Sequence, residues 1–217
     1  MTETAKKIYL YGGLLGGIAL VIGILIGVTA PKLTVLTTEL SSVDHTRGDK
    51  ESNIILIEYS DFQCPACKQY SEVVKEVVSE FESHMVFAYR YFPLRQIHKN
   101  AVPSAQAAEA AGLQGKFWEM HDTLFANQEA WSPMPQAQAT EAFKAYAKAI
   151  GLDADKFEKD LNSNAVITKV NADEMSAKTA KLNHTPTFFL NGKEINNPKN
   201  LEEFRKLIRD EVEKNNK

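Results

Sequence analysis

The stretch Cys64-Pro65-Ala66-Cys67 holds both cysteines of this 217-residue chain. An apolar run at residues 54–57 precedes it and residues with helical spacing follow it, which predicts a strand, a short loop and a helix start. Cys64 then falls at the helix N-terminus, where free backbone N–H groups and the helix dipole stabilise a thiolate. Pro65 falls in the first turn, where its missing N–H is tolerated. Because a thiolate is the attacking species in thiol–disulfide exchange, this placement indicates a redox-active pair.

Two other interpretations of the cysteine pair are a structural disulfide and one half of a zinc site. A two-residue spacer closes too short a loop to stabilise the fold much through chain entropy. A zinc site needs further Cys or His ligands, and none of the histidines is spaced like a zinc ligand pair: His45, His84, His98, His121 and His184. We therefore expect no metal ligands, and we expect His98 and His121 to be structural. A Cys-x-x-Cys pair beside a β/α unit favours redox chemistry.

The first thirty residues predict a membrane anchor. The run from Ile8 to Ala30 contains no charged residue and exceeds the length of about 20 residues that a bilayer core requires. Lys6 and Lys7 precede the run, so the positive-inside rule places the N-terminus in the cytoplasm and the remaining chain outside the membrane. The alternative is a cleaved signal peptide, because residues 28–30 form a small-residue cleavage pattern. The length of the apolar run favours an uncleaved, single-pass anchor.

The composition excludes some classes of partner. The chain has 25 Lys and Arg against 28 Asp and Glu, a net charge of −3, and no run of basic residues. It therefore lacks the electrostatic footprint of a nucleic-acid-binding protein. Residues 31–40 are rich in threonine and predict a linker, and residues 41–217 predict one domain. The absence of cysteines outside the pair is compatible with an oxidising compartment.

The hydrophobic pattern of residues 41–217 predicts a mixed α/β domain. A strand, a helix and a strand are expected in succession at residues 54–59, 64–81 and 85–92. Residues 43–49 are polar and predict a turn that leads into the first of these strands.

The second half of the domain predicts a helical insertion. From about residue 98 to residue 181 the sequence is helical in character and predicts four or five helices, more than one crossover connection needs. A hairpin is expected at residues 187–195, because Asn191-Gly192 is a strong turn signal. An amphipathic helix that begins near Leu201 closes the domain.

Four motifs along the domain carry a resemblance to a known family. They lie at residues 61–67, 91–94, 115–121 and 185–189, and they read Asp-Phe-Gln-Cys-Pro-Ala-Cys, Tyr-Phe-Pro-Leu, Gly-Lys-Phe-Trp-Glu-Met-His and Thr-Pro-Thr-Phe-Phe. With the order of elements, they resemble the bacterial DsbA-like thiol–disulfide oxidoreductases of the thioredoxin superfamily, most closely the membrane-anchored members. The resemblance covers about residues 41–217. It implies an α/β thioredoxin fold, βαβ followed by ββα, with the helical subdomain inserted and one transmembrane helix in front.

The resemblance also implies roles for five residues. Cys64 would be the nucleophile and Cys67 its resolving partner, with no cofactor beyond the disulfide that they form. Thr185 and Pro186 match the cis-proline loop of the family, which lies against the disulfide and leaves the Thr185 backbone free to pair with an extended substrate. The alternative is an ordinary trans proline at the start of a strand. His184 departs from the small or apolar residue usual before this pair and would alter substrate contacts.

Glu58 matches a buried acid of the same family. It ends the apolar strand shortly before Cys64. A carboxyl group in apolar surroundings has a raised pKa and can pass protons to or from Cys67. The alternative is a solvated acid at the end of the strand.

The implied function is a membrane-tethered oxidoreductase that introduces disulfide bonds into unfolded exported proteins. A quinone-linked membrane protein, DsbB-like or vitamin K epoxide reductase-like, would reoxidise it. The dipeptide Pro65-Ala66 lacks the histidine of the strongest oxidants in the family, which leaves a reductase or an isomerase open, because direction follows the reduction potential. A metallochaperone that binds a soft metal through both thiolates is a third alternative, although no third ligand lies near the pair in the sequence.

Overall fold

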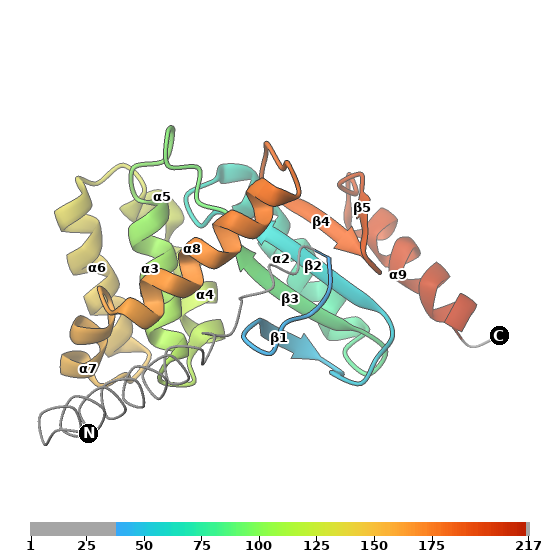
Figure 1. The fold of residues 1–217 in the computed structure, drawn as a ribbon, viewed down its shortest axis with the longest axis horizontal. Coiled ribbons are helices and arrows are strands. Elements are labelled where there is room, and N and C mark those ends of the chain that lie inside the picture. Colours follow the sequence, from blue (N-terminus) through green and yellow to red (C-terminus); the bar gives the residue numbers. More distant parts are fainter. Residues whose placement is uncertain (1–37, 216–217) are drawn as a thin grey trace, which may run out of the picture. The chain divides into compact units, whose positions relative to one another are not determined.

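A computed structural model describes residues 38–215 of the chain (Figure 1). In this part of the chain, five strands form one mixed sheet in the order β1-β3-β2-β4-β5. β2 and β3 are parallel and the other neighbours are antiparallel. The strands are β1 (His45–Gly48), β2 (Ile55–Ser60), β3 (Val86–Tyr91), β4 (Thr187–Leu190) and β5 (Lys193–Ile195).

Helices cover both faces of this sheet. α2 (Pro65–Glu80) follows β2, and α9 (Leu201–Asn215) follows the β4–β5 hairpin. Six helices lie between β3 and β4 and form the insertion: α3 (Ala101–Gly112), α4 (Phe117–Ala126), α5 (Gln128–Trp131), α6 (Gln136–Ala149), α7 (Ala154–Asp160) and α8 (Asn164–Thr179). The predicted α/β sheet with a helical insertion is therefore present.

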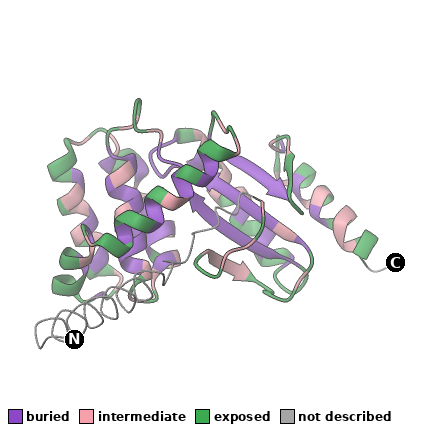
Figure 2. Ribbon diagram, viewed as in Figure 1, coloured by how far each residue is buried: buried purple, intermediate pink, exposed green. Residues whose placement is uncertain are grey.

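The central strands β2, β3 and β4 are buried at every residue except the first of β2, as Figure 2 shows. Successive residues of β2 face opposite sides of the sheet. Leu56 joins the larger hydrophobic cluster with Val77 of α2 and Phe204 of α9, whereas Ile57 joins a smaller cluster with Ala177 of α8. A strand that is covered on both faces is apolar at nearly every position, which is why residues 54–57 show no alternation.

The turn predicted at residues 43–49 is wrong for His45–Gly48, which form β1 and pair with β3. β1 is an edge strand with polar side chains, so the apolar pattern does not reveal it. Its side chains find individual partners instead. His45 Nε2 lies 2.7 Å from Glu109 Oε2, and an Arg47 nitrogen lies 3.1 Å from an Asp122 carboxylate oxygen.

The insertion has six helices where the sequence predicts four or five. One additional break falls at Asn127, between α4 and α5, where the side-chain amide donates to Thr123 O at 2.8 Å. Another falls at Ser163, whose hydroxyl caps α8 by accepting from Val166 N at 3.3 Å. Asn and Ser side chains compete in this way with the hydrogen bonds of the helix backbone. Neither break contains a Gly or Pro, so the sequence does not reveal it.

The hairpin predicted between β4 and β5 is confirmed. Asn191 and Gly192 both have positive φ, 48° and 78°. A two-residue turn of this kind requires positive φ at both positions, which Asn and Gly adopt readily.

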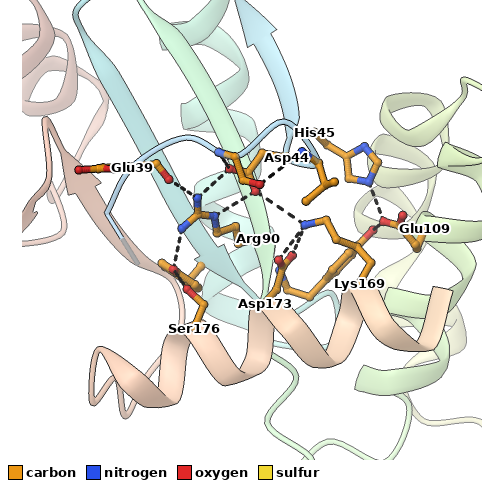
Figure 3. Close-up of polar contacts among 12 residues, drawn as sticks. Glu39, Asp44, His45, Arg90, Glu109, Lys169, Asp173 and Ser176 are labelled. Atoms are coloured by element: carbon orange, nitrogen blue, oxygen red, sulfur yellow. Dashed lines mark hydrogen bonds and ion pairs between the residues drawn. The ribbon is translucent and has the colours of Figure 1, made fainter. Parts of the chain in front are cut away.

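A buried network of charges holds α8 and the chain near residue 44 against β3 (Figure 3). Arg90 and Asp44, each with a side chain 2% exposed, lie 2.7 Å apart. Lys169 on α8 lies 2.7 Å from Asp173 and 3.7 Å from Asp44. Arg90 also donates to Tyr59 at 2.9 Å. Asp44 is shared by Arg90 and Lys169, so removing this carboxylate would take a counter-charge from two buried cations at once, which is strongly destabilising.

The anchor predicted for residues 1–30 and most of the linker predicted for residues 31–40 lie outside the described residues. Within residues 38–215, no helix combines the length and the apolar character needed to cross a membrane.

Candidate active site

The cysteine pair lies where β2 passes into α2. Cys64 is the N-cap residue of α2 and Pro65 is the first helical residue, as the sequence predicts. Cys64 N donates to Asp61 O at 3.0 Å, which closes the loop between the two elements. Both cysteines are free thiols. Cys64 is 7% exposed and Cys67 is 0% exposed, while Pro65 is exposed and Ala66 is half-buried. An attacking group therefore meets Cys64 first.

The pKa of Cys64 is lowered to about 5, chiefly because the Cys67 thiol donates a hydrogen bond to its sulfur. Burial opposes this shift. The Thr185 hydroxyl and the backbone N–H groups of Cys67 and Ala66 also lower the pKa. Neither N–H group forms a capping hydrogen bond to the Cys64 side chain. Both instead act on the Cys64 sulfur as nearby dipoles at the start of the helix. Cys64 is consequently a thiolate at neutral pH.

Cys67 has the opposite character. Its burial, followed by its hydrogen bond to the Cys64 sulfur, raises the pKa of Cys67 well above the ordinary range. Its sulfur accepts from Asp61 N at 3.5 Å. One sulfur of the pair is thus ionised and reachable, and the other is protonated and enclosed.

The loop before β4 lies against Cys64. The Thr185–Pro186 peptide bond is cis, as the family resemblance implies, and the trans alternative is wrong. The Cys64 thiol lies 3.6 Å from Thr185 O, to which it donates when protonated. Thr185 and Pro186 are buried, and the Asn197 side chain donates to Pro186 O at 2.8 Å.

His184 lies on the exposed side of the same loop. Its ring nitrogen Nδ1 is 3.0 Å from Asn183 Oδ1, and its backbone carbonyl accepts from the Thr187 hydroxyl at 2.8 Å. The structure therefore leaves His184 exposed beside the cis-proline loop, with its ring paired to the Asn183 side chain.

Glu58 is buried beneath the active helix, with 2% exposure, so the alternative of a solvated acid is wrong. Burial raises the pKa of Glu58 from 4.5 to about 7, the Ser60 hydroxyl lowers it, and negative charge on Cys64 raises it further. Charge on Glu58 in turn contributes to the raised pKa of Cys67. Among the described residues, Glu58 Oε1 has no hydrogen-bond partner of ordinary geometry. The same holds for the hydroxyl of Tyr89, which pairs with Glu58 across β2 and β3.

The structure adds a carboxylate and a histidine to the candidate site residues. Asp61 is fully buried and accepts from His98 Nδ1 at 2.7 Å and from Leu94 N at 2.9 Å. The hydrogen bond to Asp61 raises the pKa of His98, and negative charge on Cys64 adds to that shift. His98, expected to be only structural, is therefore within electrostatic range of the reactive sulfur. Nothing in the spacing of residues 61 and 98 signals this contact.

Among residues 38–215, no group of three or more His, Cys, Asp or Glu side chains is arranged to hold a metal ion.

Known proteins resemble this chain in sequence. The chain matches the family model described as Thioredoxin over residues 41–210. It is 39% identical over 159 residues to the Na(+)/H(+) antiporter NhaA 1 of Mycobacterium sp. (strain KMS), an alignment that covers 71% of this chain and 24% of that protein. The chain thus spans about a quarter of the length of the curated relatives that it matches.

Solved structures extend the likeness to the whole domain. Alpha-DsbA1 of Wolbachia pipientis has a TM-score of 0.71 and 19% identity, over 81% of this chain and 94% of that chain. MdbA of Actinomyces oris, a thiol-disulfide oxidoreductase, has a TM-score of 0.64 and 18% identity, over 81% of this chain and 92% of that chain. The chain therefore belongs to the thioredoxin family, and its fold is that of the DsbA-like thiol–disulfide oxidoreductases.

Proposed function

We propose that the chain is a thiol–disulfide oxidoreductase that introduces disulfide bonds into unfolded exported proteins. The observation that carries this proposal is the opposite ionisation of two neighbouring sulfurs: the pKa of Cys64 is lowered to about 5 and that of Cys67 is raised. Such a pair supplies both a stable thiolate leaving group and a protonated resolving thiol. The position of the Thr185 carbonyl, 3.6 Å from Cys64, supports a role for this loop in pairing with an extended substrate backbone.

The reaction starts from the oxidised pair. A substrate thiolate attacks the sulfur of Cys64, a new disulfide joins substrate to Cys64, and the Cys64–Cys67 bond breaks with its electron pair passing to Cys67. Cys67 then takes a proton, which the carboxyl group of Glu58 supplies. A second substrate thiolate attacks the substrate sulfur of the mixed disulfide, and Cys64 leaves as a thiolate. Two substrate thiols are oxidised and the cysteine pair is reduced.

The lowered pKa of Cys64 supports the oxidising direction. A thiolate that is stable at neutral pH stabilises the reduced enzyme and leaves a mixed disulfide easily. The reduced enzyme then needs an electron acceptor, for which we propose a quinone-linked membrane protein, DsbB-like or vitamin K epoxide reductase-like. No cofactor beyond the Cys64–Cys67 disulfide is required.

The reduction potential decides between an oxidase and a reductase. The purified protein, equilibrated with glutathione buffers, should show a potential well above the value of about −270 mV that is typical of thioredoxin. It should also form disulfides in a reduced, unfolded substrate at a rate that depends on added enzyme. A potential near or below that of thioredoxin, with net reduction of a disulfide substrate, would establish a reductase instead.

We also propose that residues 1–30 anchor the chain in the cell membrane with the catalytic domain outside. The uncharged run after Lys6 and Lys7 supports this topology. After mild reduction, a membrane-impermeant thiol reagent should label Cys64 in intact cells. Labelling that requires lysis would contradict this topology, and a shortened soluble product that begins at Pro31 would establish a cleaved signal peptide.

A further inference from the structure

Two buried glutamine side chains cross between the active-site loop and the helical insertion. Gln128 extends from α5, is 4% exposed, and donates from Nε2 to Phe62 O at 2.7 Å and to Cys64 O at 2.9 Å. Both hydrogens of its amide are therefore used on the carbonyls that flank Gln63 in the loop.

Gln63 makes the reverse connection. Its Nε2 donates to Ser132 O at 2.9 Å, just beyond α5, and its Oε1 accepts from Asn100 N at 2.6 Å, just before α3. We call Gln63 and Gln128 the glutamine clamp. Its two amides fix the loop to two separate segments of the insertion, so the loop is held by residues distant from it in the sequence.

The bond to Cys64 O acts at the first turn of α2. Cys64 O also accepts from Lys68 N at 3.2 Å, the hydrogen bond that starts the helix. The orientation of this carbonyl is coupled to the orientation of the N–H groups at the helix start, since they belong to the same turn. Those N–H groups are the dipoles that face the Cys64 sulfur. Without Gln128, Cys64 O would keep only the Lys68 hydrogen bond, and one fewer donor would fix its orientation in this buried region.

The clamp also affects charge near the sulfur. The carbonyl oxygens of Phe62 and Cys64 both carry partial negative charge, and both point to one amide nitrogen. The amide N–H groups offset that charge in a region that water reaches poorly, where such dipoles act strongly. Offsetting the partial negative charge of the two carbonyls stabilises a nearby negative charge. It therefore has the largest effect when Cys64 is a thiolate and the smallest when Cys64 is part of a neutral disulfide.

We propose that Gln128 is a positioning residue of the active site, whose amide holds the Phe62 and Cys64 carbonyls so that the start of α2 stabilises the Cys64 thiolate. The proposal rests on the proposed role of Cys64 as the reactive thiolate. It assigns the insertion a part in setting the reactivity of the cysteine pair, through one side chain of α5.

Glu129, the next residue after Gln128, offers a matched control for the Gln128 variants. Glu129, which is 87% exposed, forms an ion pair with Lys68 at 2.6 Å and so joins the same two helices at the surface. An exposed pair of this kind contributes little to stability. Glu129→Gln removes a link between α5 and α2 without touching the carbonyls of the loop.

The test uses the full chain in its reduced form, with the rate of Cys64 alkylation measured against pH and the potential measured in glutathione buffers. Gln128→Met keeps the length of the side chain and removes both donors. We expect the pKa of Cys64 to rise by about half a unit or more, with a shift of the potential to more negative values. Glu129→Gln should leave both quantities at the parental values.

A second variant covers the case in which Gln128→Met does not fold. Gln128→Asn keeps a polar amide but is one methylene too short to reach both carbonyls, and the same rise in the pKa of Cys64 is expected. A folded variant of either kind with the parental titration and potential would overturn the proposal. A parental Cys64 that titrates like a free thiol, near a pKa of about 8.5, would instead count against the proposed function itself.

Discussion

Replacing Cys64 with serine is expected to reduce thiol–disulfide exchange to the uncatalysed rate, whereas Cys67→Ser should trap the enzyme on its substrate. Cys64 is the less deeply buried of the two cysteines, and its sulfur is ionised at neutral pH. A serine hydroxyl does not ionise in this range and forms no disulfide, so no mixed disulfide can start. In Cys67→Ser, Cys64 still exchanges with a substrate disulfide, but no internal thiol remains to release the product.

The two variants are distinguished by mass spectrometry and non-reducing gels after incubation with a disulfide substrate. A mixed disulfide through Cys64 should accumulate in Cys67→Ser and be absent in Cys64→Ser. Mixed disulfides in both variants, or turnover in either one at the parental rate, would contradict the assignment of nucleophile and resolving thiol.

A third variant tests why Cys64 is so acidic. The thiol of Cys67 is the first cause of the lowered pKa of Cys64. Cys67→Ala removes that donor, whereas Cys67→Ser replaces it with a hydroxyl that can also donate. Alkylation of Cys64 should therefore be half-maximal at a higher pH in Cys67→Ala than in Cys67→Ser. Equal titrations would assign the shift to the helix start and Thr185 instead.

The sequence predicts those parts of the site that depend on neighbours in the chain. The apolar run of β2, the position of Cys64 at the start of α2 and the Asn191-Gly192 turn all follow from local patterns. The resemblance to a family supplies the Thr185–Pro186 loop, which lies against Cys64 although no local pattern requires it. Periodicity and family likeness together therefore predict the frame of the site and its two sulfurs.

Contacts made by polar side chains across long separations are not predictable in this way. Gln128 and Cys64 O are 64 positions apart, and Asp61 and His98 are 37 apart. In a sequence, a glutamine in a helical stretch looks the same whether it is solvated or bonded to a buried carbonyl, and so does a histidine that pairs with a buried carboxylate. β1 is missed for a related reason, because a short polar edge strand pairs through its backbone and shows no apolar period.

The second large effect is expected for Glu58→Gln, first in stability. The pKa of Glu58 is raised in the folded protein from 4.5 to about 7, mainly by burial. A carboxyl group with a raised folded pKa contributes its full stability below pH 4.5, and that contribution is lost as pH rises through 7. The loss amounts to about 3 kcal/mol once the group is fully ionised. The glutamine variant does not ionise, so it should become more stable than the parent as pH rises across this interval.

Unfolding is best measured on the oxidised form, in which neither cysteine titrates. The charge on Cys64 is only the third contribution to the pKa of Glu58, so burial keeps that pKa raised when the disulfide is present. The difference in free energy of unfolding between variant and parent should therefore grow as pH rises from 4.5. It should level off once pH exceeds the folded pKa of Glu58, which is about 7. Glu72→Gln, which changes an exposed acid on α2, is the matched control and should show no such trend.

The same substitution should slow the redox reaction, and the two effects together would identify Glu58 as the proton carrier for Cys67. Cys67 is enclosed and its pKa is raised, so it cannot leave the disulfide as a free thiolate without a proton from nearby. Glu58 is buried, is half-protonated near neutral pH and contributes to the raised pKa of Cys67, which makes it suited to deliver that proton. In Glu58→Gln the rate of exchange near pH 7 should fall by about tenfold or more, and its pH profile should lose one ionisation. The gain in stability without a change in rate or profile would show that Glu58 is buried near the cysteines but takes no part in the proton transfer.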